Sequence, residues 1–213
     1  MEIAASVAER KITSKKNGAR TGFLTDPFRM RQIGYESGLE EAWLMVKIVD
    51  PDVFEIREQQ RCRIPFKGEV AVHYFDMLLT MIDGRKIAGA VKYRKDTKED
   101  LRALLRAGAD TVGDSFADDW KIYSESQLTR TRIRNARKII DCGQDFDFEA
   151  QNALAIALVG HGPEIRVADC DAILGDGERG SRAAMALIQS GKLVIGDDDR
   201  LGRNTVLRNL FTN

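Results

Sequence analysis

The sequence predicts an α/β protein in which a mixed sheet is flanked by helices and is followed by a small helical region that ends in a hairpin. Two observations carry this prediction. Before residue 145, short runs rich in β-branched and aromatic residues alternate with segments of helical periodicity. After residue 145, alanine-rich helical segments follow one another and a strand pair closes the chain. The first part therefore describes a sheet covered by helices.

The composition is that of an ordinary globular protein. The 213 residues include 33 basic and 33 acidic side chains, and 43% are hydrophobic. No apolar run approaches the ~20 residues that span a bilayer, so we expect no membrane segment and a cytoplasmic location. The cysteines, Cys62, Cys142 and Cys170, lie far apart and indicate neither a disulfide framework nor a zinc site. The zero net charge argues against a protein that coats nucleic acid, because phosphate neutralisation dominates such binding.

The chain begins with an irregular basic stretch and then a helix. Residues 1–34 show little periodicity and are predicted to form a basic arm. From Glu36, apolar residues such as Leu39 and Trp43 fall at helical spacing, and Asp50-Pro51 ends the segment. An amphipathic helix is therefore expected directly after the arm.

The sheet is predicted from four runs that follow this helix. They span 53–59, 61–66, 70–81 and 86–93. A tight Asp83-Gly84 turn joins the last two, which predicts an antiparallel meander. A capping box at 97–100 opens the next helix, and a short strand at 120–124 and a helix at 129–140 follow.

The C-terminal part is predicted to be a separate small domain. Helices are expected at 148–159, 167–174 and 179–190, before a hairpin formed by 193–195 and 204–207. Three helices followed by a hairpin are the element order of a winged helix-turn-helix. The predicted division is an arm at 1–34, a sheet domain at 35–144 and a winged-helix-like domain at 145–213.

Three chemistry-bearing side chains occupy positions that the predicted elements bring near one another. Glu40 lies one helical turn after Glu36, at the margin of the apolar face of the first helix. Asp76 interrupts an apolar strand, and Lys92 lies on the partner strand at a comparable distance from the Asp83-Gly84 turn. Carboxylate oxygens suit a hard cation such as Mg²⁺, and a lysine beside them stabilises charge on a phosphate. The pattern indicates a metal site for phosphodiester hydrolysis.

The residues around these positions resemble the N-terminal domain of the TnsA endonuclease family, which belongs to the PD-(D/E)xK nucleases. The resemblance covers about residues 30–140. It is carried, in order, by Glu36-Ser37-Gly38-Leu39-Glu40, Val49-Asp50-Pro51-Asp52-Val53, Ile56-Arg57-Glu58-Gln59, Phe75-Asp76, Val91-Lys92 and Tyr123-Ser124-Glu125-Ser126-Gln127-Leu128. It implies a restriction-endonuclease-like sheet with a winged-helix-like domain after it.

The resemblance also implies roles and partners. Glu40, Asp76 and Lys92 take the places of the family's catalytic residues, and the two carboxylates with the Val91 carbonyl would bind Mg²⁺ or Mn²⁺. The implied activity is nicking of one strand of double-stranded DNA at transposon ends, beside a DDE-type transposase and an AAA+ ATPase regulator. Basic residues are then candidate DNA contacts, namely Lys15, Lys16, Arg130, Arg134 and Arg137.

Ala90 departs from the family pattern, in which the residue two before the lysine is Asp, Glu or Gln. Alanine removes an oxygen ligand or a hydrogen-bond partner. Three interpretations follow: a weakened but active nuclease, an inactive family member kept for DNA or partner binding, and an engineered substitution that disables cleavage.

Each site residue also has a simpler interpretation. Glu36 and Glu40 fit a solvated helix edge, and Asp76 fits an outward-facing strand position. Lys92 fits an exposed residue of an alternating strand, with Arg94 or Lys95 as the alternative functional cation. Gln59 either orients a group of the site or satisfies strand backbone. For the whole chain, the alternatives are a non-catalytic DNA-binding or assembly subunit and a winged-helix transcription regulator. The acidic turn of the terminal hairpin repels phosphate, which favours protein binding by the last domain.

Overall fold

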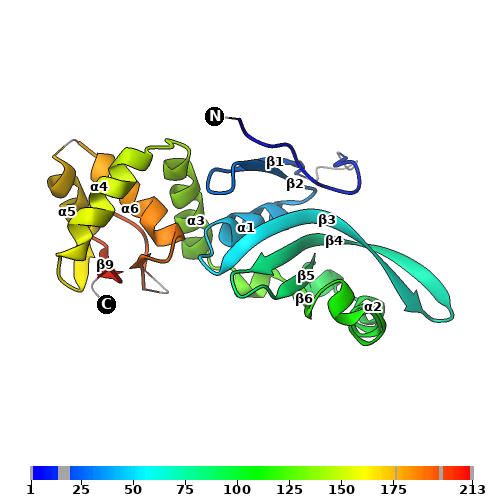
Figure 1. Cartoon of the computed structure of the whole chain (residues 1–213). Helices are drawn as coiled ribbons and strands as arrows, with labels where there is room; N and C mark the ends of the chain where they lie inside the picture. Colours follow the sequence, from blue (N-terminus) through cyan, green and yellow to red (C-terminus); the bar gives the residue numbers. More distant parts are fainter. Residues whose placement is uncertain (1, 14–19, 176, 197–198, 212–213) are drawn as a thin grey trace. The chain divides into compact units, whose positions relative to one another are not determined.

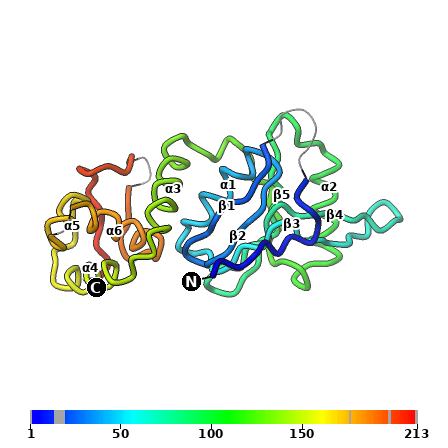
Figure 2. Tube along the Cα trace, turned by 90° about the horizontal axis from the view of Figure 1, so that it is seen from above, coloured from blue at the N-terminus to red at the C-terminus, as the bar shows by residue number. Residues whose placement is uncertain are grey.

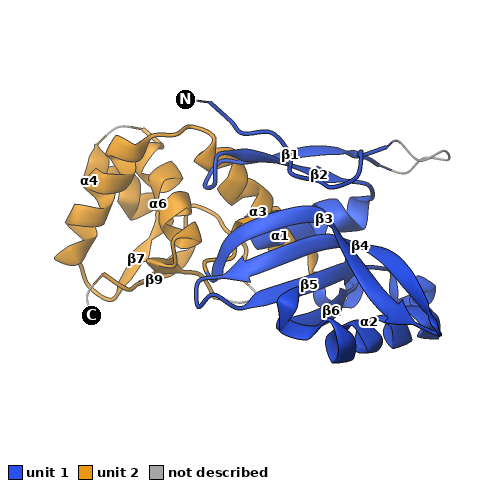
Figure 3. Cartoon of the chain, turned by 45° about the vertical axis from the view of Figure 1, so that its right-hand side comes forward, with its two compact units in different colours: residues 1–47, 52–128 blue, residues 48–51, 129–213 orange. Residues whose placement is uncertain are grey.

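The computed structural model describes residues 2–13, 20–175, 177–196 and 199–211, which form two compact units (Figure 3). The first unit comprises residues 1–47 and 52–128, and the second comprises 48–51 and 129–213. The division after Leu128 lies earlier in the chain than the predicted boundary at 144/145. The reason is that α3 (Arg130–Gly143) packs on α6 (Arg179–Gln189) and so belongs with the helical unit.

The first unit holds a small hairpin, the main sheet and two long helices (Figure 1). In chain order its elements are β1 (Gly22–Asp26), β2 (Arg31–Tyr35), α1 (Gly38–Ile48), β3 (Val53–Phe66), β4 (Glu69–Met81), β5 (Lys86–Val91), η1 (Arg94–Asp96), α2 (Glu99–Thr111), η2 (Gly113–Ser115), β6 (Asp119–Tyr123) and η3 (Glu125–Gln127). The predicted irregular arm at 1–34 therefore needs a correction. It contains the antiparallel hairpin β1–β2, whose turn begins at Asp26, where the carboxylate accepts the N–H groups of Phe28 and Arg29.

The main sheet is mixed, as predicted, with strand order β3-β4-β5-β6. The strands β3, β4 and β5 form the expected antiparallel meander, and β6 runs parallel to β5. The β3–β4 hairpin extends well past β5 (Figure 1). Its turn places Lys67 and Gly68 at positive φ, as tight hairpin turns require.

Helices cover both faces of this sheet. On one face, an apolar cluster that includes Phe75, Ala88 and Ala90 packs against Leu105 of α2. Because alternate strand residues point to opposite faces, Gly89 belongs to the other face. There a Cβ on Gly89 would lie 2.7 Å from the Tyr123 ring, which in turn contacts the Trp43 ring of α1 in a tilted arrangement with the centroids 4.7 Å apart. Glycine at position 89 thus permits the Tyr123 ring to lie against β5, between the sheet and α1.

Strand β3 is continuous where the sequence predicted two runs divided at Gln60. Pairing with β4 continues on both sides of Gln59, since Glu58 lies opposite Met77 and Gln60 opposite Phe75. Gln59 itself has a φ of 50°, in the left-handed region that non-glycine residues rarely adopt. The side chains of 58, 59 and 60 are all buried, so the strict alternation of the strand fails at this point.

The start of α2 differs from the prediction. The helix begins at Glu99 after Lys98, and no side chain caps it. The Thr97 hydroxyl donates to the Tyr93 carbonyl oxygen at 3.0 Å. Thr97 is therefore engaged with the preceding turn, and the predicted capping box at 97–100 is wrong.

The second unit is helical with a small antiparallel sheet. Its elements are α3, α4 (Phe148–Val159), β7 (Glu164–Arg166), α5 (Val167–Leu174), α6, β8 (Leu193–Val194) and β9 (Val206–Asn209). The three predicted helices and the terminal hairpin are present, and the sheet order β7-β9-β8 adds a strand that the sequence analysis missed. Among the described residues, no helix is both long enough and apolar enough to cross a lipid bilayer.

Candidate functional site

The first turn of α1 fixes the position of Glu40. The Glu40 N–H donates to the Ser37 hydroxyl at 3.2 Å, so Ser37 acts as the cap of the helix. In return, the Glu40 carboxylate accepts the Glu36 N–H at 2.8 Å and the Ser37 hydroxyl at 3.0 Å. The side chain is 5% exposed. The predicted alternative of a solvated helix edge is therefore wrong for Glu40.

Asp76 lies where β4 and β5 part. Backbone pairing of these strands extends from Thr80↔Lys86 to Met77↔Gly89. One residue further, the Asp76 carboxylate takes the place of a ladder partner and accepts the Val91 N–H at 2.6 Å. Its other oxygen accepts the Gln59 side-chain amide at 3.3 Å. Asp76 is 8% exposed, so it does not face outward into solvent as the simpler interpretation had it.

The charges of the three predicted site residues act on one another. Burial raises the pKa of the Glu40 carboxyl, and the negative charge of Asp76 raises that pKa further. The hydrogen bonds from Glu36 and Ser37 and the positive charge of Lys92 oppose this rise. Lys92 is half-buried just beyond β5, where its N–H donates to the Tyr123 carbonyl oxygen at 3.0 Å. The fold thus brings two buried carboxyls and one ammonium group into one electrostatic environment.

The donor set suits a hard cation. The negative charge of Asp76 disfavours the ionised form of the buried Glu40 carboxyl, and a bound cation relieves that repulsion. Over the residues that the structure describes, no group of three or more His, Cys, Asp or Glu side chains is arranged to hold a metal ion. The predicted set is of a different kind, because it combines two carboxylates with the Val91 carbonyl.

Comparisons with known proteins add no relative. No protein-family model matches the chain, and no curated protein matches it.

Ala90 is a core residue. It is 0% exposed and belongs to the apolar cluster with Phe75, Leu78 and Leu105. The strand register that pairs Met77 with Gly89 carries Ala90 opposite Asp76. Alanine at this position fills space between the sheet and α2, so a longer polar side chain would have to enter an apolar environment.

Three of the predicted DNA contacts lie among the described residues, all of them in the second unit. Arg130, Arg134 and Arg137 all lie on α3 in the second unit, and all three are exposed. Lys15 and Lys16 lie outside the described residues.

Two residues near the site were not predicted to belong to it. Arg10 comes from the N-terminal stretch, and its Nε donates to the Gln59 side-chain oxygen at 2.7 Å. His73 is half-buried, and among the described residues its Nε2 has no hydrogen-bond partner. Burial lowers the pKa of His73, the charge of Asp76 raises it, and those of Lys92 and Arg10 lower it. No local signal in the sequence marks Arg10, because its partner lies on a distant strand.

Proposed function

We propose that this protein is a metal-dependent DNA endonuclease of the TnsA-like type, which nicks one strand at the ends of a transposon. One observation carries the proposal: the Glu40 carboxyl is buried within reach of the charges of both Asp76 and Lys92. An acid pair from a helix and a strand, with a lysine directly after the partner strand, is consistent with the TnsA-like motifs.

Each residue has a distinct task in this proposal. The Glu40 and Asp76 carboxylates and the Val91 carbonyl would hold Mg²⁺ or Mn²⁺. A bound ion of this kind supplies an activated water and neutralises charge on the phosphate. The Lys92 ammonium stabilises negative charge on the phosphate oxygens. Gln59 holds the Asp76 carboxylate in place through its amide.

The finer fold assignments belong to the same proposal. A restriction-endonuclease-like sheet is supported by the parting of β4 and β5 at the Asp76 carboxylate. A winged-helix-like second unit is supported by the order α4, β7, α5, α6, β8, β9 and by the strand order β7-β9-β8. We propose that this unit binds protein partners, a DDE-type transposase and an AAA+ ATPase regulator among them.

The experiment is a nicking assay on supercoiled DNA that carries transposon ends, with Mn²⁺ or Mg²⁺ and with the partner proteins present. We expect Asp76→Asn, Glu40→Gln and Lys92→Met to abolish nicking. Glu41→Gln is the matched control, because Glu41 is also a buried glutamate on α1 but pairs with Arg20 at 3.0 Å. Nicking that survives in Asp76→Asn would rule out the proposed site.

A second candidate function is a non-catalytic DNA-binding or assembly subunit. The packing of Ala90 in the apolar cluster favours it, as does the engagement of Asp76 with Val91. Calorimetric titration with Mn²⁺ separates the two functions, because only the nuclease predicts Mn²⁺ binding that is lost in Asp76→Asn.

A further inference from the structure

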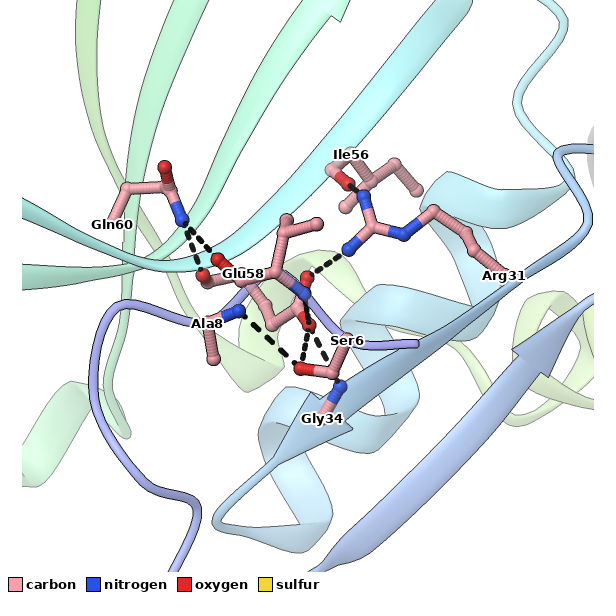
Figure 4. A network of polar contacts seen from close by, with 8 residues as sticks. Ser6, Ala8, Arg31, Gly34, Ile56, Glu58 and Gln60 are labelled. Atoms are coloured by element: carbon pink, nitrogen blue, oxygen red, sulfur yellow. Dashed lines mark hydrogen bonds and ion pairs between the residues drawn. The ribbon is translucent and has the colours of Figure 1, made fainter. Parts of the chain in front are cut away.

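An N-terminal segment, residues 6–10, is docked along β3 (Figure 2). Its anchor is Glu58, which is 0% exposed and pairs with Arg31 at 2.5 Å. The Glu58 carboxylate also accepts the Ser6 hydroxyl and, at 3.2 Å, the Val7 N–H (Figure 4). A buried carboxylate with this many donors holds the segment in one register on the strand.

The next residues of this segment continue the docking. The Glu9 N–H donates to the Gln59 carbonyl oxygen at 3.3 Å. The Glu9 carboxylate accepts the Arg61 N–H at 2.6 Å. Because both the backbone N–H and the carboxylate of Glu9 are hydrogen-bonded to β3, the next residue, Arg10, lies beside the side chain of Gln59.

Arg10 bridges several residues around the candidate site. Its Nε donates to the Gln59 side-chain oxygen at 2.7 Å, and its terminal nitrogen pairs with Glu36. Its guanidinium lies 5.3 Å from the centroid of the Tyr74 ring. One arginine from the N-terminal segment therefore connects β3, β4 and the residues that precede α1.

The contact with Arg10 decides which way the Gln59 amide points. Arginine has donors and no acceptor, so it fixes the oxygen of Gln59 on its own side. The amide nitrogen must then face Asp76, where it donates to the carboxylate at 3.3 Å. Gln59 is fully buried and has a positive φ, a conformation that costs free energy and persists only when its surroundings hold it.

A similar connection reaches the second carboxylate. Arg10 pairs with the carboxylate of Glu36, and the backbone N–H of Glu36 donates to Glu40 at 2.8 Å. Arg10 thus contacts a hydrogen-bond partner of each of the two predicted carboxylate ligands, Gln59 for Asp76 and Glu36 for Glu40. In the described structure it contacts neither carboxylate itself.

We propose that Arg10 is a positioning residue of this site, which acts on Asp76 through Gln59. The inference rests on the proposed function, since it assigns Arg10 to the same metal-binding carboxylates. Its role is to fix the Gln59 amide so that one Asp76 oxygen is held in place before a cation binds. Outer-shell contacts of this kind change metal affinity by about 10-fold to 100-fold.

The test is a double-mutant cycle on Mn²⁺ affinity, measured by calorimetry on the full chain. Arg10→Met keeps the apolar stem over Tyr74 and removes the donors, and Gln59→Met keeps the side-chain length and removes the amide. We expect each single variant to weaken Mn²⁺ binding about 10-fold or more. The double variant should be no weaker than the worse single one, because both act through one connection. Losses that multiply, or unchanged affinity in Arg10→Met, would overturn the proposal.

Arg20→Met is the matched control. Arg20 comes from the same N-terminal stretch and pairs with Glu41 of α1, so the control removes the same charge and an ion pair of the same kind. Its Mn²⁺ affinity should equal that of the unsubstituted protein. If Gln59→Met does not fold, the comparison of Arg10→Met with Arg20→Met decides alone, since Arg10 is 37% exposed and its loss leaves no cavity in the core.

Nicking kinetics give an independent readout. A positioning role predicts that Arg10→Met lowers kcat while KM for DNA stays the same. A raised KM with unchanged kcat would make Arg10 a phosphate contact and overturn the positioning role. The proposed function and the role of Arg10 can be told apart by experiment. Absence of Asp76-dependent Mn²⁺ binding in the unsubstituted protein would rule out the proposed function, whereas such binding with no effect of Arg10→Met would rule out only the role of Arg10.

Discussion

The Asp76 carboxylate accepts the backbone N–H of Val91 at 2.6 Å, at the point where β4 and β5 part. This contact gives Asp76 a structural role at the same place as its proposed role in metal binding. A substitution of Asp76 can affect both the contact with Val91 and the proposed metal binding. Two replacements that differ in keeping an acceptor for the Val91 N–H separate the two roles.

We predict that Asp76→Asn and Asp76→Ala differ in stability and agree in activity. Asparagine keeps an oxygen that accepts the Val91 N–H, whereas alanine leaves this buried donor without its partner. Alanine should therefore lower the free energy of unfolding by about 1–3 kcal/mol more than asparagine does. Both should lose nicking, and urea denaturation beside the nicking assay measures the two effects. Equal stability of the two variants would show that the Val91 contact adds nothing to folding.

Ala90→Gln is predicted to destabilise the protein rather than to restore a ligand. Ala90 is fully buried in the apolar cluster against α2, so the added atoms overpack it and bring a polar amide into it. The expected loss is about 1–3 kcal/mol in the free energy of unfolding, with no gain in Mn²⁺ affinity. Ala90→Ser, which adds one polar atom, is the smaller control. If Ala90→Gln instead gained Mn²⁺ affinity at unchanged stability, the side chain at position 90 would reach the metal site, and the prediction would be contradicted.

Local signals predicted much of the fold. The Asp83-Gly84 turn and the apolar runs on either side of it indicated β4 and β5, and helical spacing indicated α4, α5 and α6. These elements depend on residues close together in the chain, which periodicity and turn residues report. The same signals placed Asp76 and Lys92 on neighbouring strands; the structure has Asp76 on β4 and Lys92 directly after β5, which ends at Val91.

Part of what the sequence could not predict depends on distant contacts, and part depends on a local partner that competes with the expected one. The contact between Arg10 and Gln59 joins residues 49 positions apart, and the segment that carries Arg10 has no periodicity to report its docking. No sequence signal predicts the positive φ of Gln59, because a left-handed backbone conformation is usually expected at glycine or asparagine and not at glutamine. The capping box at 97–100 failed because Thr97 bonds to Tyr93, a competing local partner.

Gly180 is predicted to be the least tolerant glycine of the helical unit. A Cβ at this position would lie 1.9 Å from the carbonyl oxygen of Cys170, so α5 and α6 approach each other with no room for a methyl group. Gly180→Ala should cost about 1–3 kcal/mol or more, measured by chemical denaturation. Gly160→Ala is the control, since a Cβ there meets no atom within 4 Å. Equal stability of the two variants would contradict the close approach.

Asp147 provides a pH-dependent prediction. Hydrogen bonds from Arg179 and from the Ala150 N–H lower the pKa of Asp147 from 3.8 to about 2. A depressed carboxyl pKa stabilises the folded state above pH 3.8, and this stabilisation is lost as the pH falls through about 2. The difference in thermal midpoint between the protein and Asp147→Asn should be constant from pH 5 to 7 and narrow toward pH 2.

Salt provides the control for this ion pair. The side chains of Arg179 and Asp147 are 36% and 33% exposed, so added salt screens their attraction. The difference in midpoint at neutral pH should shrink at high ionic strength. A difference that stays constant down to pH 2 would show that the charge of Asp147 does not stabilise the fold.

The docking of residues 6–10 on β3 also limits pairing of the exposed sheet edge with other molecules. In the order β3-β4-β5-β6, β3 stands at an end, where unpaired backbone groups form a template for strands of other molecules. The segment covers that edge from Glu58 to Arg61 through backbone and side-chain hydrogen bonds. Removal of the first ten residues would therefore leave an open edge, and self-association of the shortened chain is the consequence we expect.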